Sequence, residues 1–537
     1  MVALRAEPKT LNPVIAVDAP SRDVIGRMLG DLIHINRASQ MSESALAESW
    51  KVSPDGLRYT LKLRRGIRFS DGHTFNADDV VFTFQVYLDA ALHSPQRDLL
   101  IVGGKPISVQ KLDTFTVRFE LAQPYAAAER LFDGIAILPR HILQNPYREG
   151  RLAQMWTLTA PPSEVVGLGP FRVKEYIPGQ QLVLERNPYY WKIDRKKTRL
   201  PYLDEIAFLF VSSEDAQVIR FQAGDTDLMS RMSAENYAIL ERDQHARGYR
   251  VQDLGPGLEY NFLFFNSNSI LPKDSAIARQ QRWFRDVRFR QAVSSAIDRS
   301  SIVRLVYRGR GSPLVTHVTP ANKLWVNTSI APPVRSLEKA RELLKSAGFS
   351  WKSDGTLHDS AGETVEFTIL SSASNAQRTQ MATIIQDDLR TLGMRVQVVP
   401  LEFRAMLDRV FQSHDYEAAV MAFGGGDVDP NPQINVWLSS GSNHVWDLGE
   451  SKPATTWEAE IDELMRRQLS TLNVKQRKRL YDRVQQLVAE NLPLICIAAP
   501  NILVGARNRL GNFQPAILDH YTLWNADELF FRPDVAH

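Results

Sequence analysis

The sequence predicts an α/β protein built from at least two lobes. Its 537 residues exceed the size at which a single hydrophobic core keeps growing. In the first 125 residues apolar and polar side chains alternate with the period of strands, whereas from about residue 263 the apolar residues recur with the period of helices. In this C-terminal half strand, helix and strand follow one another, which favours a parallel sheet covered by helices.

The composition is that of an ordinary globular protein. Hydrophobic residues make up 44% of the chain and charged residues 23%, which argues against extensive disorder. The 64 basic and 61 acidic residues nearly balance, with a net charge of +3, whereas nucleic-acid scaffolds normally carry a concentrated basic surface. The longest apolar runs, Ile206–Val211 and Leu492–Pro500, are too short to cross a bilayer. We therefore expect no nucleic-acid partner and no transmembrane helix.

The single cysteine and the N-terminus do not decide the cellular compartment. Cys496 lies in the apolar run Leu494–Ala499, so we expect a small buried side chain and no disulfide. Met1 is followed by Val-Ala-Leu-Arg-Ala-Glu, without the apolar region of a signal peptide. Either the protein is cytoplasmic, or the chain is a mature form with an added methionine.

The N-terminal region predicts an antiparallel sheet and a capped helix. Apolar and polar residues alternate over Tyr59–Leu63 and again over Phe115–Leu121, which indicates two half-buried strands. Between them, Asn76 is placed to cap a helix whose first turn carries Asp78 and Asp79, because carboxylates favour the positive end of the helix dipole.

The middle of the chain predicts a crossing between lobes and then a hairpin. The stretch 161–170 is rich in proline and glycine, as expected where the chain passes between lobes. The strands expected around Phe171–Tyr176 and Leu182–Arg186 are joined by a turn at Pro178 and Gly179. A strand over Ile206–Val211 and a helix near Glu214–Ala223 follow.

Two capped helices organise the C-terminal half. Ser336 is placed to cap the helix that begins at Leu337 and stops at Gly348, and Asn375 to cap a helix that stops at Gly393. The strand Arg395–Pro400 follows directly. Sheets of this kind bind ligands at the carboxyl ends of their strands.

Motifs of catalysis and of metal binding were not found. The chain contains no H-E-x-x-H, no G-x-x-x-x-G-K-[ST] and no G-x-S-x-G. Its 11 histidines are scattered, without an i,i+4 pair on a helix face. We therefore expect no catalytic residue, no metal site and no cofactor.

A glycine run after an apolar strand is the most informative segment. Gly424, Gly425 and Gly426 follow the strand-like Ala418–Phe423, and glycines there let the backbone of a ligand approach closely. Asp427 and Asp429 could accept charge-assisted hydrogen bonds from a cationic amine. Alternatively, the segment is an acidic turn before Pro430 in which Asp429 caps the next element. We place Phe423, Gly425, Gly426, Asp427 and Asp429 among the predicted ligand-binding residues.

A second candidate segment lies at the entrance to the strand Phe262–Phe265. Gly255, Pro256 and Gly257 precede it, which suggests a lobe boundary where hinge residues absorb backbone rotation. Glu259, Tyr260 and Asn261 could then face a cleft, although an ordinary position in the strand fits them nearly as well.

Two arginines and a tryptophan complete the predicted site. Arg378 lies one turn into the helix that follows the strand Thr364–Leu370, where a guanidinium can hold a carboxylate bidentately. Arg404 makes a similar, weaker case. Both could instead be exposed helix residues. Trp437, like Trp446, could form an aromatic wall or lie in the core.

Six segments, in the order in which they occur along the chain, resemble the family 5 extracellular solute-binding proteins. These are the dipeptide, oligopeptide and nickel receptors of ABC importers. The resemblance covers essentially the whole chain. The segments are Glu7–Pro13, Leu46–Gly72, Asn76–Phe84, Gly167–Phe171 with Leu184–Trp191, Val287–Arg299 and Ala340–Phe349.

The resemblance implies a periplasmic-binding-protein-like α/β fold, with two lobes that each contain a helix-covered sheet and with an inserted smaller α+β domain. Lobe I would comprise residues 1–38, 165–262 and 496–537, the inserted domain 39–164, and lobe II 263–495. It further implies a monomer in the periplasm or another extracytoplasmic location. There the protein would capture a peptide or a similar small polar ligand between its lobes and deliver it to an ABC permease in the inner membrane.

The resemblance also implies roles for individual residues. Peptide receptors of this family hold the amino terminus of the ligand with an aspartate four positions before the proline of an acidic-Pro pair. Counted from Pro430, that position is Gly426, and Asp427 is displaced from it by one residue. Arg378 falls near the arginine that dipeptide receptors use for the ligand's carboxylate.

Two other functions remain possible from the residues. A hydrolase could use the paired carboxylates of Asp427 and Asp429, although it would need two pKa values that are well separated. A ligand-sensing regulator could use the same fold behind a DNA-binding segment, but no such segment precedes Leu11.

Overall fold

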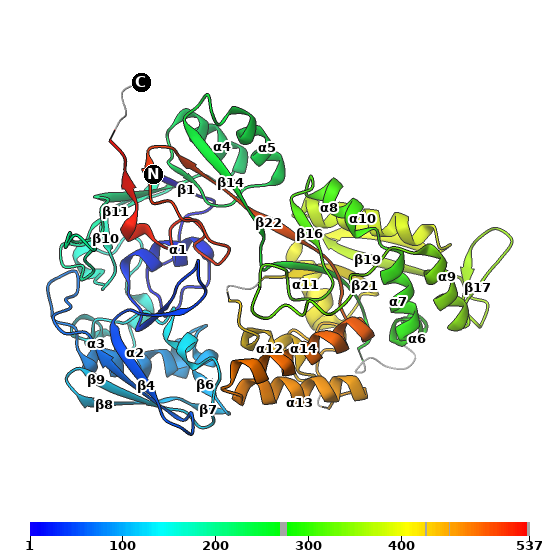
Figure 1. Cartoon of the computed structure of the whole chain (residues 1–537), viewed down its shortest axis with the longest axis horizontal. Helices are drawn as coiled ribbons and strands as arrows, with labels where there is room; N and C mark the ends of the chain where they lie inside the picture. The colour runs from blue at the N-terminus through cyan, green and yellow to red at the C-terminus, as the bar shows by residue number, and fades with distance from the viewer. Residues whose placement is uncertain (269–276, 425–426, 451, 534–537) are drawn as a thin grey trace. The chain divides into compact units, whose positions relative to one another are not determined.

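The computed structural model describes residues 1–268, 277–424, 427–450 and 452–533 (Figure 1). The chain folds into two compact units: unit 1 comprises Met1–Leu254 and Leu503–His537, and unit 2 comprises Gly255–Ile502. The finer division expected from the sequence, with an inserted domain over 39–164, stays a prediction. Among the described residues, every helix is too short or too polar to span a membrane.

The larger sheet of unit 1 is mixed. Its order is β10-β11-β12-β1-β13, followed by the C-terminal part of β22. The hairpin expected around Pro178 and Gly179 is present as the antiparallel pair β10 and β11, while β1 lies parallel to both β12 and β13. The strands are β10 (Phe171–Ile177), β11 (Gln181–Arg186), β12 (Glu205–Phe210), β1 (Val2–Leu4), β13 (Leu228–Met229), β14 (Tyr249–Pro256) and β22 (Ile495–Arg507).

The predicted antiparallel sheet also lies in unit 1. It has the order β4-β5-β9-β8, and Tyr59 on β5 is directly opposite Phe119 on β9. Asn76 caps α2, and the Asp79 side chain accepts a hydrogen bond from the Asn76 amide to close a capping box. The elements are β4 (Ala47–Val52), β5 (Arg58–Leu63), β9 (Thr116–Glu120), β8 (Ser108–Asp113), α2 (Ala77–Leu88) and α3 (Arg140–Arg148).

The other elements of unit 1 are short strands and three helices. The helices are α1 (Ala19–Met28), α4 (Glu214–Ala223) and α5 (Ala234–Asp243), and the short strands are β2 (Ile33–Ile35), β3 (Ser42–Ser44), β6 (Ile101–Val102), β7 (Lys105–Pro106), β23 (Leu510–Gly511) and β24 (Phe530–Phe531).

The sheet of unit 2 is mixed, so the expected parallel arrangement holds for some of its strands but not for all. The N-terminal part of β22 starts the order β22-β15-β21-β19-β20. The strands β20, β19 and β21 are parallel as expected, but β15 is antiparallel to both β21 and β22. The strands are β15 (Tyr260–Phe265), β21 (Ala418–Phe423), β19 (Glu366–Ser372), β20 (Arg395–Leu401), β16 (Gly311–Pro313), β17 (Ser350–Trp351) and β18 (Leu357–His358).

Helices cover both faces of this sheet (Figure 1). Because side chains of a strand point alternately to opposite faces, Leu263 and Phe265 join one core with α6 to α10, while Phe262 and Phe264 join a second core with α11 to α14. Buried Cys496 belongs to the second core, as expected for a small hydrophobic side chain. The helices are α6 (Ala278–Arg285), α7 (Val287–Ala296), α8 (Arg299–Val306), α9 (Leu337–Ser346), α10 (Ala376–Arg390), α11 (Phe403–Asp408), α12 (Ile434–Trp437), α13 (Thr456–Ser470) and α14 (Val474–Asn491).

The chain crosses between the units twice, between Leu254 and Gly255 and between Ile502 and Leu503. Gly255 has a φ of +80°, in the left-handed region that favours glycine. A Cβ atom on Gly257 would lie only 2.7 Å from Cδ1 of Ile502. The first residues of unit 2 therefore need glycine for two different reasons, a backbone angle and a close approach.

Candidate ligand-binding site

Three strand ends meet at one edge of the unit 2 sheet. β21 ends at Phe423, and because β15 runs antiparallel to it, Tyr260 at the start of β15 is directly opposite Phe423. β19 is parallel to β21 and leads from the same edge into α10. The two segments that the sequence singled out separately, around residues 259–261 and 423–429, are thereby neighbours.

Arg378 joins this edge from the first turn of α10. The Asn375 side chain caps the helix and accepts a hydrogen bond from the Arg378 amide (2.9 Å). The Arg378 guanidinium donates from Nε to Oδ1 of Asn261 (3.2 Å) and from Nη2 to Oε1 of Glu259 (3.4 Å). Three predicted residues from two segments thus contact one another.

The environment of Asn261 fixes this group. Its side chain is fully buried, and its amide nitrogen lies 3.2 Å from both the Tyr307 hydroxyl and the Ala498 carbonyl, to which it donates. The side chains of Arg378 and Glu259 remain 21% and 25% exposed. The guanidinium is therefore oriented by a rigid partner and is still open to solvent, which is the arrangement that suits recognition of a carboxylate.

Tyr260 and Phe423 form the apolar part of the edge. Their rings lie 6.0 Å apart, and Phe423 is half-buried. Tyr260 is only 2% exposed, and its hydroxyl donates to Oε1 of Gln433 (2.9 Å). Phe423 is therefore the more accessible of the two aromatic side chains.

The acidic loop divides into an open part and a buried part. Gly424 is exposed, and a Cβ atom there would meet nothing within 4 Å. Gly425 and Gly426 lie outside the described residues. Asp427 is half-buried, and its Oδ1 accepts a hydrogen bond from the Asp429 amide (3.2 Å). The Gly424 backbone thus leaves room for a ligand.

Asp429 has an internal partner. Both of its carboxylate oxygens accept hydrogen bonds from Arg477 of α14, at 2.6 and 2.7 Å, and the two side chains are only 5% and 4% exposed. Oδ1 also accepts from the Asn431 amide (2.9 Å). This geometry favours the alternative that Asp429 caps the next segment, and ligand contact by Asp429 stays an untested prediction.

Trp437 and Arg404 lie in contrasting surroundings. Trp437 is 1% exposed and packs against His317, with ring centroids 4.2 Å apart, which favours its alternative role as a core residue. Arg404 is exposed on α11, which favours the alternative that it is an ordinary helix-surface residue.

A pocket of about 190 Å³ lies within unit 1 and was missed by the sequence analysis. Its lining includes three arginines, one aspartate and two histidines: Arg22, Arg27, Arg37, Asp31, His34 and His520. His34 lies in the three-residue strand β2, and Asp31 precedes it. A strand of this length is too short to produce a periodic pattern. Spacing in the sequence therefore gave no signal for this pocket.

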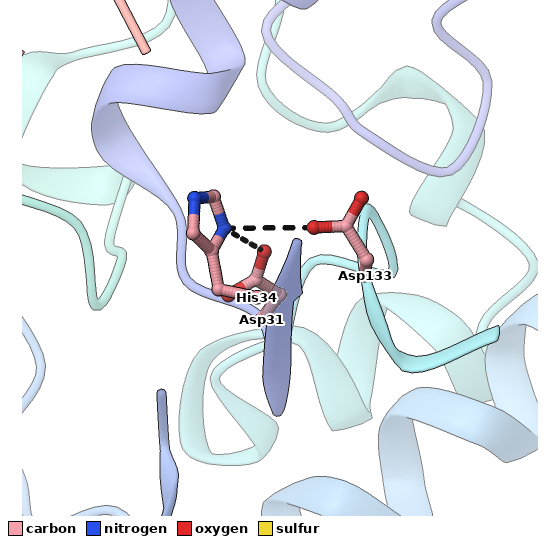
Figure 2. A group of neighbouring side chains, drawn as sticks. All are labelled: Asp31, His34 and Asp133. Atoms are coloured by element: carbon pink, nitrogen blue, oxygen red, sulfur yellow. Dashed lines mark hydrogen bonds and ion pairs between the residues drawn. The ribbon is translucent and has the colours of Figure 1, made fainter. Parts of the chain in front are cut away.

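A pair of carboxylates flanks His34 in this pocket. Figure 2 shows Nδ1 of His34 facing both Asp31 and Asp133, at 3.2 Å from Oδ2 of Asp31 and 3.5 Å from Oδ1 of Asp133. Arg37 donates to Oδ2 of Asp133 (3.0 Å). Burial opposes a charge on the ring, but the carboxylates outweigh it and raise the pKa of His34.

The pKa of His520 shifts in the opposite direction. Desolvation by burial lowers the pKa of His520, although the carboxylate of Asp23 (2.8 Å from Nδ1) opposes the shift. The lining therefore combines three arginines, one aspartate and two histidines whose pKa values shift in opposite directions. Asp133 and Asp23, which are not part of the lining, pair with Arg37, His34 and His520 and offset much of its positive charge.

Comparisons with known proteins agree with this fold. A family model described as bacterial extracellular solute-binding proteins, family 5 middle, matches residues 43–444. A Deinococcus radiodurans protein named as a probable ABC transporter-binding protein is 27% identical to this chain. The alignment covers 98% of this chain and 91% of that protein. The oligopeptide-binding protein AppA of Bacillus subtilis is 29% identical, and its alignment covers 92% of this chain and 85% of AppA.

A solved structure has the same architecture. The structure of Bacillus subtilis AppA in complex with a nonapeptide matches with a TM-score of 0.73 and 25% identity, over 99% of this chain and 98% of that one. The family match covers most of the chain, including the strands β19 to β21 that form the edge described above. The chain therefore belongs to the bacterial extracellular solute-binding proteins of family 5, the substrate-binding components of ABC importers.

Proposed function

We propose that this solute-binding protein captures a peptide or a similar small polar ligand with a free carboxylate, closes its two units over it, and delivers it to an ABC permease. The observation that carries the proposal is the group formed by Arg378, Asn261 and Glu259. It presents an oriented and partly exposed guanidinium at the edge of the sheet where strands end.

Glu259 supports this role for Arg378. At 3.4 Å its contact with Nη2 is long for a charge-assisted hydrogen bond. A ligand carboxylate that approached Arg378 at a shorter distance would form the stronger pair. In the proposal, Glu259 holds the guanidinium in place until the ligand arrives.

Asp427 supports recognition of an amine. It follows Gly424, where a Cβ atom would meet nothing within 4 Å, by three residues, and it is more exposed than Asp429. If Asp427 pairs with a ligand ammonium group, Asp427→Ala lowers the affinity by about 1.5–3 kcal/mol. Unchanged affinity in titration calorimetry would remove Asp427 from the site.

Closure of the two units is the proposed mechanism of capture. Contacts available only in the closed form shift the population towards that form, and the two chain crossings provide the hinge.

Relatives support the permease partner and a role in binding. AppA of Bacillus subtilis is named an oligopeptide-binding protein, and its solved structure holds a nonapeptide. We propose a location outside the cytoplasmic membrane, a permease as partner, and a monomer that binds without turnover. None of the relatives reported above is named a hydrolase or a regulator.

Titration calorimetry tests the proposal with peptides of graded length, each paired with its C-terminal amide. The proposal expects binding of at least one free-acid peptide. It also expects a loss of about 2–3 kcal/mol, roughly 30- to 150-fold, both on amidation and in Arg378→Ala. Arg390→Ala is the matched control, because Arg390 lies at the other end of α10, pairs with Asp387 and is exposed. Equal binding by acid, amide and Arg378→Ala would refute the role of Arg378.

A further inference from the structure

A buried cluster of one histidine and two glutamates lies elsewhere in unit 2. The side chains of His444, Glu450 and Glu458 are only 1%, 2% and 5% exposed. Each offers one donor atom, and these atoms all lie within 4.8 Å of one another. Glu458 is on α13, while His444 and Glu450 come from the segment that precedes this helix.

The orientation of His444 is fixed by its other ring nitrogen. Nδ1 lies 3.1 Å from the Val436 carbonyl, to which it donates, so Nε2 carries the lone pair in the neutral ring. The ring also packs on Trp446, with centroids 3.8 Å apart. Nε2 thereby faces Oε2 of Glu450 and Oε1 of Glu458, both at 3.7 Å. A histidine that donates its second N–H to a backbone carbonyl is the usual arrangement at a metal site.

Glu458 is held by hydrogen bonds from its surroundings. Oε1 accepts from Nε1 of Trp446 (3.0 Å), and Oε2 accepts from the Thr455 hydroxyl (2.7 Å). Both contacts leave the carboxylate facing His444. Arg290 is also near Glu458, but its hydrogen bonds go to the backbone carbonyls of Asn491 and Phe284.

The cluster contains polar atoms that the described residues leave unsatisfied. Among the described residues, Nε2 of His444 and both carboxylate oxygens of Glu450 have no partner within hydrogen-bond geometry, although the Asp447 side chain and the Ala454 backbone lie close to Glu450. At 3.7 Å, the contacts of Nε2 with the two carboxylates are too long for hydrogen bonds. A buried polar group without a hydrogen-bond partner destabilises the folded chain, and more so when it is charged.

We propose that His444, Glu450 and Glu458 bind a divalent transition-metal ion of the Zn²⁺ class as a structural site. An ion between Nε2, Oε2 of Glu450 and Oε1 of Glu458 would satisfy all three groups and balance the two carboxylates. Zn²⁺ bonds of about 2.0–2.2 Å put tetrahedral ligand atoms about 3.4 Å apart. The two 3.7 Å separations from Nε2 therefore need only a small contraction, and the donor atoms of the two glutamates lie within 4.8 Å of each other.

The donor set selects the class of ion. An imidazole nitrogen suits Zn²⁺ and its neighbours among the transition metals, whereas Ca²⁺ requires six to eight oxygen ligands and Mg²⁺ retains several waters. The site is independent of ligand capture, because its effect is to fasten the segment that contains His444 and Glu450 to α13. This role goes beyond the proposed function and survives if that proposal fails.

Metal analysis of the purified, folded chain tests this proposal. The protein is first treated with EDTA, then dialysed against Zn²⁺ and against metal-free buffer, and bound zinc is measured by mass spectrometry alongside a thermal melt. We expect one equivalent of zinc and a higher melting temperature in the wild type. Glu450→Gln should lose more than about tenfold in zinc affinity while remaining folded, because the amide keeps the size of the side chain and removes its charge.

Glu460→Gln is the matched control, because Glu460 lies on the same helix but is exposed and pairs with Arg483. It should bind zinc as the wild type does. Absence of stoichiometric zinc from the wild type, with equal melting temperatures in both buffers, would overturn the proposal and leave a proton as the group that neutralises the cluster. Unchanged zinc binding by Glu450→Gln would overturn it as well.

Discussion

Replacing Asp429 by asparagine removes one charge from a buried ion pair in unit 2. Asp429 and Arg477 are 5% and 4% exposed and share two hydrogen bonds of 2.6 and 2.7 Å. In Asp429→Asn the guanidinium of Arg477 stays buried without its counter-charge. Removal of one partner from a buried pair costs about 3–5 kcal/mol. For a unit of this size that corresponds to a melting temperature lower by roughly 6–20 °C.

The assay is thermal and urea unfolding, followed by circular dichroism and tryptophan fluorescence. Asp427→Asn is the control, because Asp427 is half-buried and its replacement should change stability by only about 0.5 kcal/mol. The double variant Asp429→Leu with Arg477→Met removes both charges, so it should be more stable than either single variant. An Asp429→Asn protein that melts like the wild type but binds ligand poorly would refute the structural role assigned here to Asp429.

Three further outcomes follow from the geometry. Gly424→Ala should fold with wild-type stability, because the added Cβ meets nothing within 4 Å. The variant should bind ligand more weakly in calorimetry, and unchanged affinity would remove the Gly424 backbone from the site. Gly255→Ala should cost about 1–2 kcal/mol in urea unfolding because φ is +80°, and an unchanged midpoint would contradict this. His34 has a raised pKa, so its stabilisation is complete below its unfolded pKa of about 6.5 and is lost as the pH rises through the folded value. Melting of His34→Asn and wild type across pH should therefore differ most at low pH, and a difference that grows with pH would contradict the ion pair.

Local signals in the sequence predicted much of the fold. Asn76, Ser336 and Asn375 cap α2, α9 and α10 as expected, because an N-cap depends on neighbouring residues alone. The helix expected near Glu214–Ala223 has those bounds. The alternating apolar residues of β5 and β9 face each other across one ladder, since a period of two fixes the buried face of a strand.

Non-local pairing was harder to predict. β15 runs antiparallel to β21, and nothing in the residues of a fully buried strand specifies the direction of its neighbour. The partner of Asp429 is Arg477, 48 residues further along the chain, so the sequence could not distinguish a ligand contact from an internal ion pair. The cluster at His444 was missed for a related reason, because its three residues follow no spacing characteristic of metal ligands.

The candidate site was predicted in part. Arg378 contacts both Asn261 and Glu259, although the sequence placed it in a different segment from these two residues. Strand ends and glycines identified these segments, because open edges of a sheet depend on local patterns. The pocket lined by Arg22, Asp31 and His34 was not predicted, since it forms from one face of α1, from a three-residue strand and from loops that are distant in the sequence.

Native mass spectrometry of the purified wild-type and Arg378→Ala proteins tests the central claim most directly. Capture of a small carboxylate-bearing ligand predicts an added mass on the wild type that disappears on denaturation and returns when the released molecule is added back. The same molecule should bind Arg378→Ala at least about tenfold more weakly. Equal retention of the molecule by both proteins, or breakdown of the bound molecule during incubation, would contradict the account.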